Sequence, residues 1–214
     1  MVDRIFDVEA IKQLDVAVPE TVYPPREDSF LLCEAIAELN FGKNTNALEI
    51  GCGSGIVTIM MSGLGWKVTA YDVNPFAISA TFGNLKNLNL HKNACVIEGG
   101  LGEGLEITKE VDLLVWNIPY LDVEKGSSVL SPIEDAAMID IPHGGWGKFL
   151  ATFLSDRSSV ISRDLLVVLL LKIDPEGQSK IEDWSNMGWS HRVLKEIRLG
   201  DEKIAVVAFW PTAS

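Results

Sequence analysis

Three glycines at alternate positions, Gly51, Gly53 and Gly55, have a spacing that indicates ligand chemistry. They follow a short apolar run, Ala47 to Ile50, and precede a longer one, Ile56 to Leu64. A strand, a glycine loop and a helix in this order bring backbone amides and a helix N-terminus close to a nucleotide-like ligand. The spacing is not the nicotinamide pattern G-x-G-x-x-G, because the third glycine comes one residue early.

Two acids flank this loop. Glu49 stands two positions before the first glycine, and the E-x-G-x-G-x-G form resembles motif I of the class I S-adenosylmethionine (SAM) methyltransferases. Asp72 follows a predicted strand, Lys67 to Tyr71, and lies 21 residues beyond Gly51. A ribose-binding acid follows the glycine loop of a βαβ unit at about 20 residues. Asp72 could also cap a helix beginning at Pro75, but its register with the loop favours the binding role.

A second group of candidate residues, Asn117-Ile118-Pro119-Tyr120, comes directly after the predicted strand Val111 to Trp116. Ligands of open α/β sheets bind beyond the carboxyl ends of the strands, so this group is expected beside the glycine loop. Asn117 offers an acceptor, the carbonyl of Ile118 can point into the site, and Tyr120 offers a flat face for stacking. By itself the sequence fits equally a proline turn with a packed tyrosine.

Two acceptors and an aromatic face suit a planar –NH2 group, either an amide or an amino group on a heterocycle. These nitrogens are poor nucleophiles because their lone pair is delocalised. Positioning the lone pair in line with a sulfonium methyl is then the main catalytic device. No strong base is required before transfer, since the proton becomes acidic once the nitrogen is alkylated.

Strands alternate with helices through the rest of the chain, which predicts an α/β fold. We expect a Rossmann-like class I SAM-methyltransferase fold with a seven-stranded, mostly parallel sheet and an antiparallel edge hairpin around Gly200-Asp201. Residues 122–142 have little periodicity and are predicted to be a long loop. Further strands are expected at Asn93–Ile97, Leu165–Lys172, Trp189–Arg198 and Glu202–Trp210, and further helices at Pro75–Asn89, within His143–Ser155 and at Glu176–Asn186.

The N-terminal 20 residues have weak periodicity and are expected to form an arm or a short helix, followed by a single domain over residues 21–214. Pro24 and Pro25 fix an extended entry, after which Asp28 or Ser29 can cap a helix. The helix is predicted at Phe30 to Leu39. A functional interpretation is that Tyr23 and the cap region fold over the ligand site.

Composition restricts the functional class. The net charge of −12 disfavours non-specific nucleic-acid binding, which depends on neutralising phosphates, and favours a basic protein partner. Cys33, Cys52 and Cys95 are scattered, which suggests a reducing, cytoplasmic compartment and no metal site. No apolar run is long enough to span a bilayer, and residues 1–20 lack the apolar core of a signal peptide.

From about Val22 to Trp210 the chain resembles the HemK-type protein-glutamine methyltransferases, especially the short eukaryotic and archaeal branch that modifies the Gly-Gly-Gln glutamine of class 1 release factors. The motifs that carry this resemblance are Val22–Leu32, Leu48–Gly55, Val111–Tyr120, Gly144-Gly145 with Gly147, and Arg198–Glu202. The bacterial branch carries a separate helical domain before the core, for which this chain has too few residues.

The resemblance implies SAM as the cofactor, a basic release factor as the substrate and a small zinc-binding activator protein at an apolar strand edge. Asn117, Ile118, Pro119 and Tyr120 are the implied catalytic group. Two positions depart from the family: Ile118 replaces the first proline of N-P-P-Y, and Gly100 replaces an acid, for which Glu98 could substitute. The implied cofactor-binding residues are Tyr23, Ser29, Glu49, Gly51, Gly53, Asp72, Val73, Leu101 and Asn117.

Two other interpretations stay open. The ribosomal-RNA adenine dimethyltransferases have a similar N-I-P-Y sequence, but they are basic and carry a helical C-terminal domain. A catalytically weak SAM-binding subunit would also fit the two departures. The acidic charge and the terminal strands favour a glutamine amide over a nucleobase.

Overall fold

The structure, a computed structural model, describes residues 7–39, 41, 44–102, 104–119 and 145–212. The chain divides into two compact units, Met1–Glu106 and Ile107–Ser214. The expectation of a single domain over residues 21–214 stays a prediction. Among the described residues, no helix has both the length and the apolar character needed to cross a membrane.

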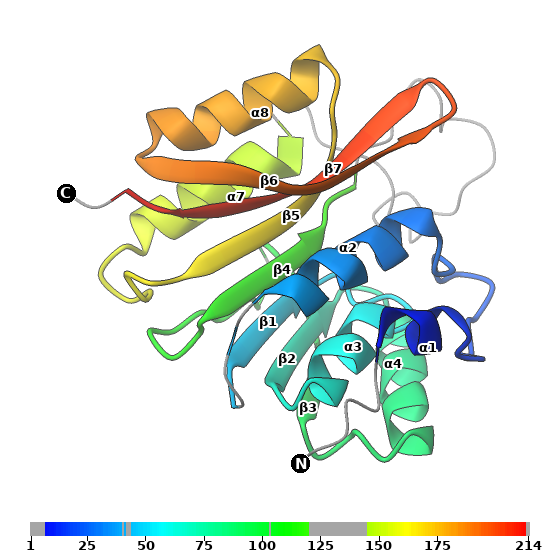
Figure 1. Ribbon diagram of the computed structural model, residues 1–214. Coiled ribbons are helices and arrows are strands. Elements are labelled where there is room, and N and C mark those ends of the chain that lie inside the picture. Colours follow the sequence, from blue (N-terminus) through cyan, green and yellow to red (C-terminus); the bar gives the residue numbers. More distant parts are fainter. Residues whose placement is uncertain (1–6, 40, 42–43, 103, 120–144, 213–214) are drawn as a thin grey trace. The chain divides into compact units, whose positions relative to one another are not determined.

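The first unit is a parallel sheet with a helical layer packed against it (Figure 1). Its strands run in the order β3-β2-β1 and pair in parallel. Helix α3 packs beside α2 and α4, and α4 packs on β2 and β3. The elements are α1 (Val8–Lys12), α2 (Glu27–Glu38), β1 (Asn46–Ile50), α3 (Ile56–Gly63), β2 (Lys67–Asp72), α4 (Pro75–Asn87) and β3 (Ala94–Glu98).

The second unit contains the remaining strands in the order β4-β5-β7-β6. Strand β4 pairs in parallel with β5, whereas β7 is antiparallel to both β5 and β6. The chain thus contains the predicted seven-stranded, mostly parallel sheet. The elements are β4 (Leu113–Asn117), α7 (Gly145–Asp156), β5 (Leu166–Lys172), α8 (Pro175–Asn186), β6 (Trp189–Leu199) and β7 (Glu202–Pro211).

The terminal hairpin is present, and its two strands have different surroundings. Ile204 to Phe209 of β7 are all buried, and β7 lies between β5 and β6 in the sheet. Strand β6 ends the sheet and exposes residues such as Val193 and Leu199. The unbroken apolar run in β7 is typical of a strand covered on both faces.

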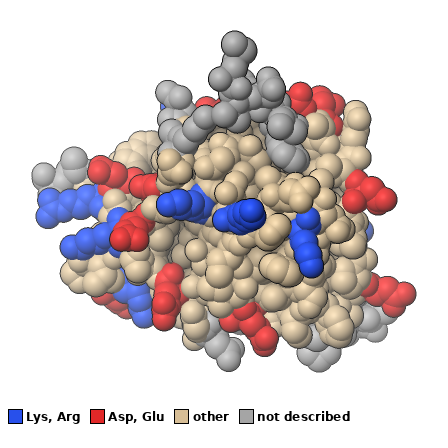
Figure 2. All heavy atoms as spheres, turned by 90° about the horizontal axis from the view of Figure 1, so that it is seen from below, with Lys and Arg blue, Asp and Glu red and all other residues tan. Residues whose placement is uncertain are grey.

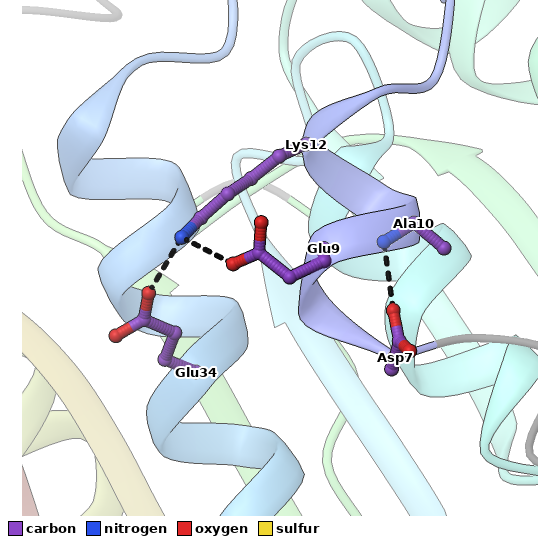
Figure 3. A network of polar contacts seen from close by, with 5 residues as sticks. All are labelled: Asp7, Glu9, Ala10, Lys12 and Glu34. Atoms are coloured by element: carbon purple, nitrogen blue, oxygen red, sulfur yellow. Dashed lines mark hydrogen bonds and ion pairs between the residues drawn. The ribbon is translucent and has the colours of Figure 1, made fainter.

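The N-terminal region folds onto the first unit. Ile11 of α1 is fully buried, and Lys12 forms ion pairs with Glu9 at 3.2 Å and with Glu34 of α2 at 3.0 Å (Figure 3). Both ion pairs lie near the surface, so their contribution to stability is small. The buried apolar contact of Ile11 is therefore the main anchor of α1.

The predicted cap of the second helix is wrong. Helix α2 begins at Glu27 and its N-cap is Arg26, which makes no side-chain cap hydrogen bond. Asp28 and Ser29 instead lie buried within the first turn, where the N–H and hydroxyl of Ser29 donate to the Asp28 carboxylate. The helix begins three residues earlier than the predicted Phe30. The spacing of residues in the sequence did not show that this first turn is buried. The predicted loop over residues 122–142 lies outside the described residues.

Candidate cofactor site

The glycine loop forms a tight left-handed turn between β1 and α3. Gly51, Gly53 and Gly55 have φ values of 69°, 56° and 86°, which side-chain-bearing residues rarely adopt. The Cys52 N–H donates to the Tyr71 carbonyl of β2 at 3.0 Å, and the Gly55 N–H donates to the Cys52 carbonyl at 2.8 Å. The three glycines are therefore spaced as they are because the backbone has a positive φ at each of these positions.

Gly53 and Gly55 have different reasons to lack a side chain. A Cβ at Gly55 would lie 2.8 Å from Oγ1 of Thr81, a residue of α4 whose hydroxyl donates to the Gly53 carbonyl at 3.0 Å. A Cβ at Gly53 would meet only the Tyr23 carbonyl oxygen, at 4.0 Å. Gly55 thus serves close helix packing, while Gly53 leaves bare backbone for a ligand. This bare backbone fits a nucleoside-type cofactor.

Asp72 ends β2 and is tied to the loop. Its carboxylate accepts from the Gly53 N–H and from the Asn74 N–H, each at 2.9 Å. Burial raises the pKa of Asp72, and the backbone N–H groups oppose that shift. Each carboxylate oxygen retains acceptor capacity for a further donor such as a ribose hydroxyl. The structure therefore brings Asp72 and Gly53 together, as the sequence predicted.

Glu49 is buried, with 4% of its surface exposed, and accepts a hydrogen bond from the hydroxyl of Thr58 on α3. Burial raises the pKa of Glu49 to about 8; the Thr58 bond opposes the shift and the nearby Asp72 adds to it. At neutral pH the carboxyl is therefore largely protonated. Direct contact between Glu49 and the cofactor stays a prediction.

Two further predicted cofactor-binding residues, Val73 and Leu101, lie after neighbouring strands. Val73 is 49% exposed directly after β2, and Leu101 is buried after β3. A Cβ at Gly100 would lie 3.1 Å from a methyl carbon of Val73, so an acidic residue there would force Val73 to move. Glu98 is exposed and pairs with Asp72 in the β2–β3 register, and its role in place of the missing acid stays a prediction.

Tyr23 lies against the loop through its backbone carbonyl, as the Gly53 geometry shows. Its ring lies under the Arg26 guanidinium, 5.3 Å from the ring centroid. Ser29 is buried in α2 and bonded to Asp28, so its predicted role toward the cofactor stays a prediction.

In the second unit, Asn117 is the last residue of β4 and leads into Ile118-Pro119. Ile118 is 1% exposed, and its terminal methyl lies 3.9 Å from where a Cβ of Gly147 on α7 would stand. Packing against α7 thus constrains the residue that replaces the family's proline. Tyr120 lies outside the described residues.

Sequence reasoning missed the polar side chains that fix the loop. Thr58 bonds Glu49, Thr81 bonds Gly53, and Asn84 donates to the Ser54 carbonyl at 2.9 Å. A signal existed: Thr81 and Asn84 interrupt the buried face of α4, and a polar residue at a buried position requires a partner.

The known proteins that this chain resembles are methyltransferases. A family model described as ribosomal protein L11 methyltransferase (PrmA) matches residues 31–123. The chain is 26% identical over 208 residues to "Putative protein N5-glutamine methyltransferase MJ0928" of Methanocaldococcus jannaschii, covering 96% of this chain and 98% of that protein. This protein is a SAM-dependent methyltransferase. It is also 32% identical over 105 residues to Methyltransferase HEMK2 of Homo sapiens, covering 47% and 49% of the two chains. The resemblance to the HemK-type enzymes is thus confirmed.

Solved structures confirm the class I SAM-methyltransferase fold. The Mtq2–Trm112 complex of E. cuniculi, responsible for methylation of the termination factor eRF1, matches with a TM-score of 0.60 at 18% identity over 90% of this chain and 99% of that chain. The hMettl16 catalytic domain, solved with MAT2A 3′UTR hairpin 1, matches with a TM-score of 0.69 at 18% identity over 97% and 82%. At such identities the likeness concerns the fold alone.

Proposed function

We propose that this methyltransferase methylates the side-chain amide nitrogen of a glutamine in a basic protein, the Gly-Gly-Gln segment of a class 1 release factor. The observation that carries the proposal is the end of β4, where Asn117 leads directly into Ile118-Pro119. The similarity to an N5-glutamine methyltransferase over nearly the whole chain supports it.

Each residue of this group has a defined task in the proposal. SAM, held by Asp72 and the glycine loop, supplies a methyl group on a sulfonium centre. The side-chain oxygen of Asn117 and the carbonyl of Ile118 accept the two amide hydrogens and so orient the nitrogen lone pair. Tyr120 stacks on the plane of the amide. The nitrogen loses one proton to solvent after it has gained the methyl group.

Charge favours a protein over a nucleic acid as the substrate. Lys and Arg number 18 against 30 Asp and Glu. On the described part of the face drawn in Figure 2, several basic side chains lie next to one another beside acidic ones at the left, and the others lie among uncharged residues. Binding of a phosphate chain would need a continuous basic surface, whereas a basic release-factor domain is attracted by the acidic balance.

The proposal includes a small zinc-binding activator that binds at a strand edge of the sheet. The two edge strands, β3 and β6, are not equally suited to pair with another protein. Strand β6 carries charged residues along its length, including Arg192 and Lys195, which discourage edge pairing. Strand β3 has the sequence Ala-Cys-Val-Ile-Glu, and Cys95 and Ile97 are exposed on it. We therefore assign the activator to the β3 edge, by strand addition. The Mtq2–Trm112 complex among the similar structures supports the presence of a partner subunit.

A reducing, cytoplasmic compartment is also part of the proposal. Cys33, Cys52 and Cys95 are all free thiols. Cys95 is exposed and would be open to oxidation elsewhere, while the other two are buried.

The decisive experiment measures methyl transfer from radiolabelled SAM to a release factor, to the same protein with the Gly-Gly-Gln glutamine changed to asparagine, and to ribosomal RNA. Each acceptor is tested with and without the candidate activator. We expect label only on the glutamine-bearing protein, with rates that fall as salt rises because the attraction is electrostatic. If the label appeared on RNA and the release factor stayed unmodified, the glutamine assignment would be wrong, and adenine would replace it as the proposed acceptor.

A matched pair of variants tests the activator edge. Ile97→Lys places a charge on exposed β3, and Val193→Lys does the same on β6. We expect the first to weaken binding of the activator at least tenfold and the second to leave it unchanged. The reverse pattern would move the partner to β6.

A further inference from the structure

A segment without regular secondary structure, Gln13 to Arg26, lies over the first unit, and we call it the strap. Val22 of the strap is buried, whereas Ala17 and several neighbours are exposed. The Tyr23 carbonyl is the group that a Cβ on Gly53 would meet, at 4.0 Å. The strap thus reaches the side of the glycine loop on which the backbone is bare.

Asn84 joins the strap to the loop. It lies on α4, is 3% exposed, and uses both ends of its amide. The oxygen accepts from the Ala17 N–H at 2.9 Å, and the nitrogen donates to the Ala17 carbonyl at 3.0 Å and to the Ser54 carbonyl at 2.9 Å. One buried side chain therefore bonds the backbone of the strap and the backbone of the loop together.

Asn74 makes a second connection. Its side-chain nitrogen donates to the Thr21 carbonyl of the strap at 2.8 Å, while its oxygen caps α4 at the Phe76 N–H. Its own N–H donates to Asp72, the predicted ribose ligand. The strap is thus attached at two points to the residues that shape the cofactor site.

We propose that the strap retains the bound cofactor and that Asn84 is the positioning residue that couples strap closure to the glycine loop. The strap forms few regular backbone bonds, so it can open while the sheet and α4 stay folded. Release of the cofactor then requires the strap to lift, and the two asparagine contacts set how often this happens. The proposal rests on SAM as the cofactor and is independent of the methyl acceptor.

The test uses the full chain and S-adenosylhomocysteine, with no acceptor present. Asn84→Ala removes the bonds of Asn84 to the Ala17 backbone and to the Ser54 carbonyl, and Ala17→Pro removes only the N–H that donates to Asn84, at an exposed position. Asn87→Ala is the matched control, because Asn87 lies on the same helix and is exposed. The measurements are amide hydrogen exchange of residues 13–26, the dissociation rate of the ligand, and the thermal unfolding midpoint.

We expect Asn84→Ala and Ala17→Pro each to speed strap exchange and ligand dissociation about tenfold, with Asn87→Ala at the wild-type values. Ala17→Pro should keep the wild-type unfolding midpoint, which separates the effect from a loss of folding. Faster strap exchange without faster dissociation would overturn the retaining role. Faster dissociation in Asn84→Ala without faster exchange of the strap would show that Asn84 acts through Ser54 alone, which also overturns the proposal.

Discussion

The glycine loop and the end of β4 are built in different ways. Side chains from neighbouring elements form hydrogen bonds with the backbone of the loop. Asp72 accepts from the Gly53 N–H, Thr81 donates to the Gly53 carbonyl, and Asn84 donates to the Ser54 carbonyl. The end of β4 takes its geometry from the strand, from the proline at position 119 and from Ile118 packed near Gly147. In the glycine loop, polar side chains fix the backbone. At the end of β4, the Asn117 side chain and the Ile118 carbonyl are themselves the groups proposed to bind the substrate.

Substitutions in the two regions should therefore change different properties. A substitution in the loop region removes a bond within the folded protein as well as a ligand contact, so stability and cofactor affinity should fall together. Substitution of Asn117 removes a group assigned to the acceptor amide, so turnover should fall while cofactor affinity stays.

Asn117→Ala should have the largest effect. Loss of the acceptor that orients the amide is expected to reduce kcat by about 100- to 1,000-fold, the range for a single transition-state hydrogen-bonding group. Binding of S-adenosylhomocysteine, measured by calorimetry, should stay within about twofold of wild type. Asn87→Ala supplies the control for an exposed asparagine. Equal losses of binding and turnover would break the comparison.

Gly55→Ala should destabilise the protein by roughly 2–4 kcal/mol, because a left-handed φ adds to a clash with Thr81. Gly65→Ala is a close control, since Gly65 has a similar φ of 88° but nothing within 4 Å of the added Cβ. It should cost only about 1 kcal/mol. Urea unfolding of both variants gives the difference, and equal costs would remove the packing argument.

Asp72→Ala should weaken S-adenosylhomocysteine binding by about 10- to 100-fold, since hydrogen bonds to charged groups contribute roughly 1.5–3 kcal/mol. It should also lower the unfolding free energy, because Gly53 and Asn74 lose an acceptor. Calorimetry on Glu98→Ala then tells whether the neighbouring acid takes part: a loss of affinity there assigns Glu98 to the site. Unchanged affinity in Asp72→Ala would remove Asp72 from it.

Glu49→Gln should change the pH dependence of stability. The pKa of Glu49 is raised from 4.5 to about 8, so between these values the folded protein holds a proton that the unfolded chain has lost. The free energy of unfolding therefore falls as pH rises through this window, by at most about 1.4 kcal/mol per pH unit. The variant should lose less stability than wild type between pH 6 and pH 8. Parallel curves from urea unfolding would contradict a buried, protonated Glu49.

Much of the fold followed from local patterns in the sequence. The apolar runs at β1 and β5, the glycine spacing and the proline at position 75 each act on a few neighbouring residues, and the structure has the corresponding elements within a residue or two. The same holds for Asp72, because a fixed crossover length sets its register with the loop.

Tertiary structure alone decided the partners. The contacts of Glu49 with Thr58, of Gly55 with Thr81 and of Asn84 with Ala17 join residues from different parts of the fold, and no local spacing encodes them. Likewise, β7 is an inner strand because β6 pairs outside it. The sequence by itself indicated candidate residues for SAM binding. Packing between helices and strands determined what holds those residues in place, because a buried polar group must find its partner wherever the fold brings one.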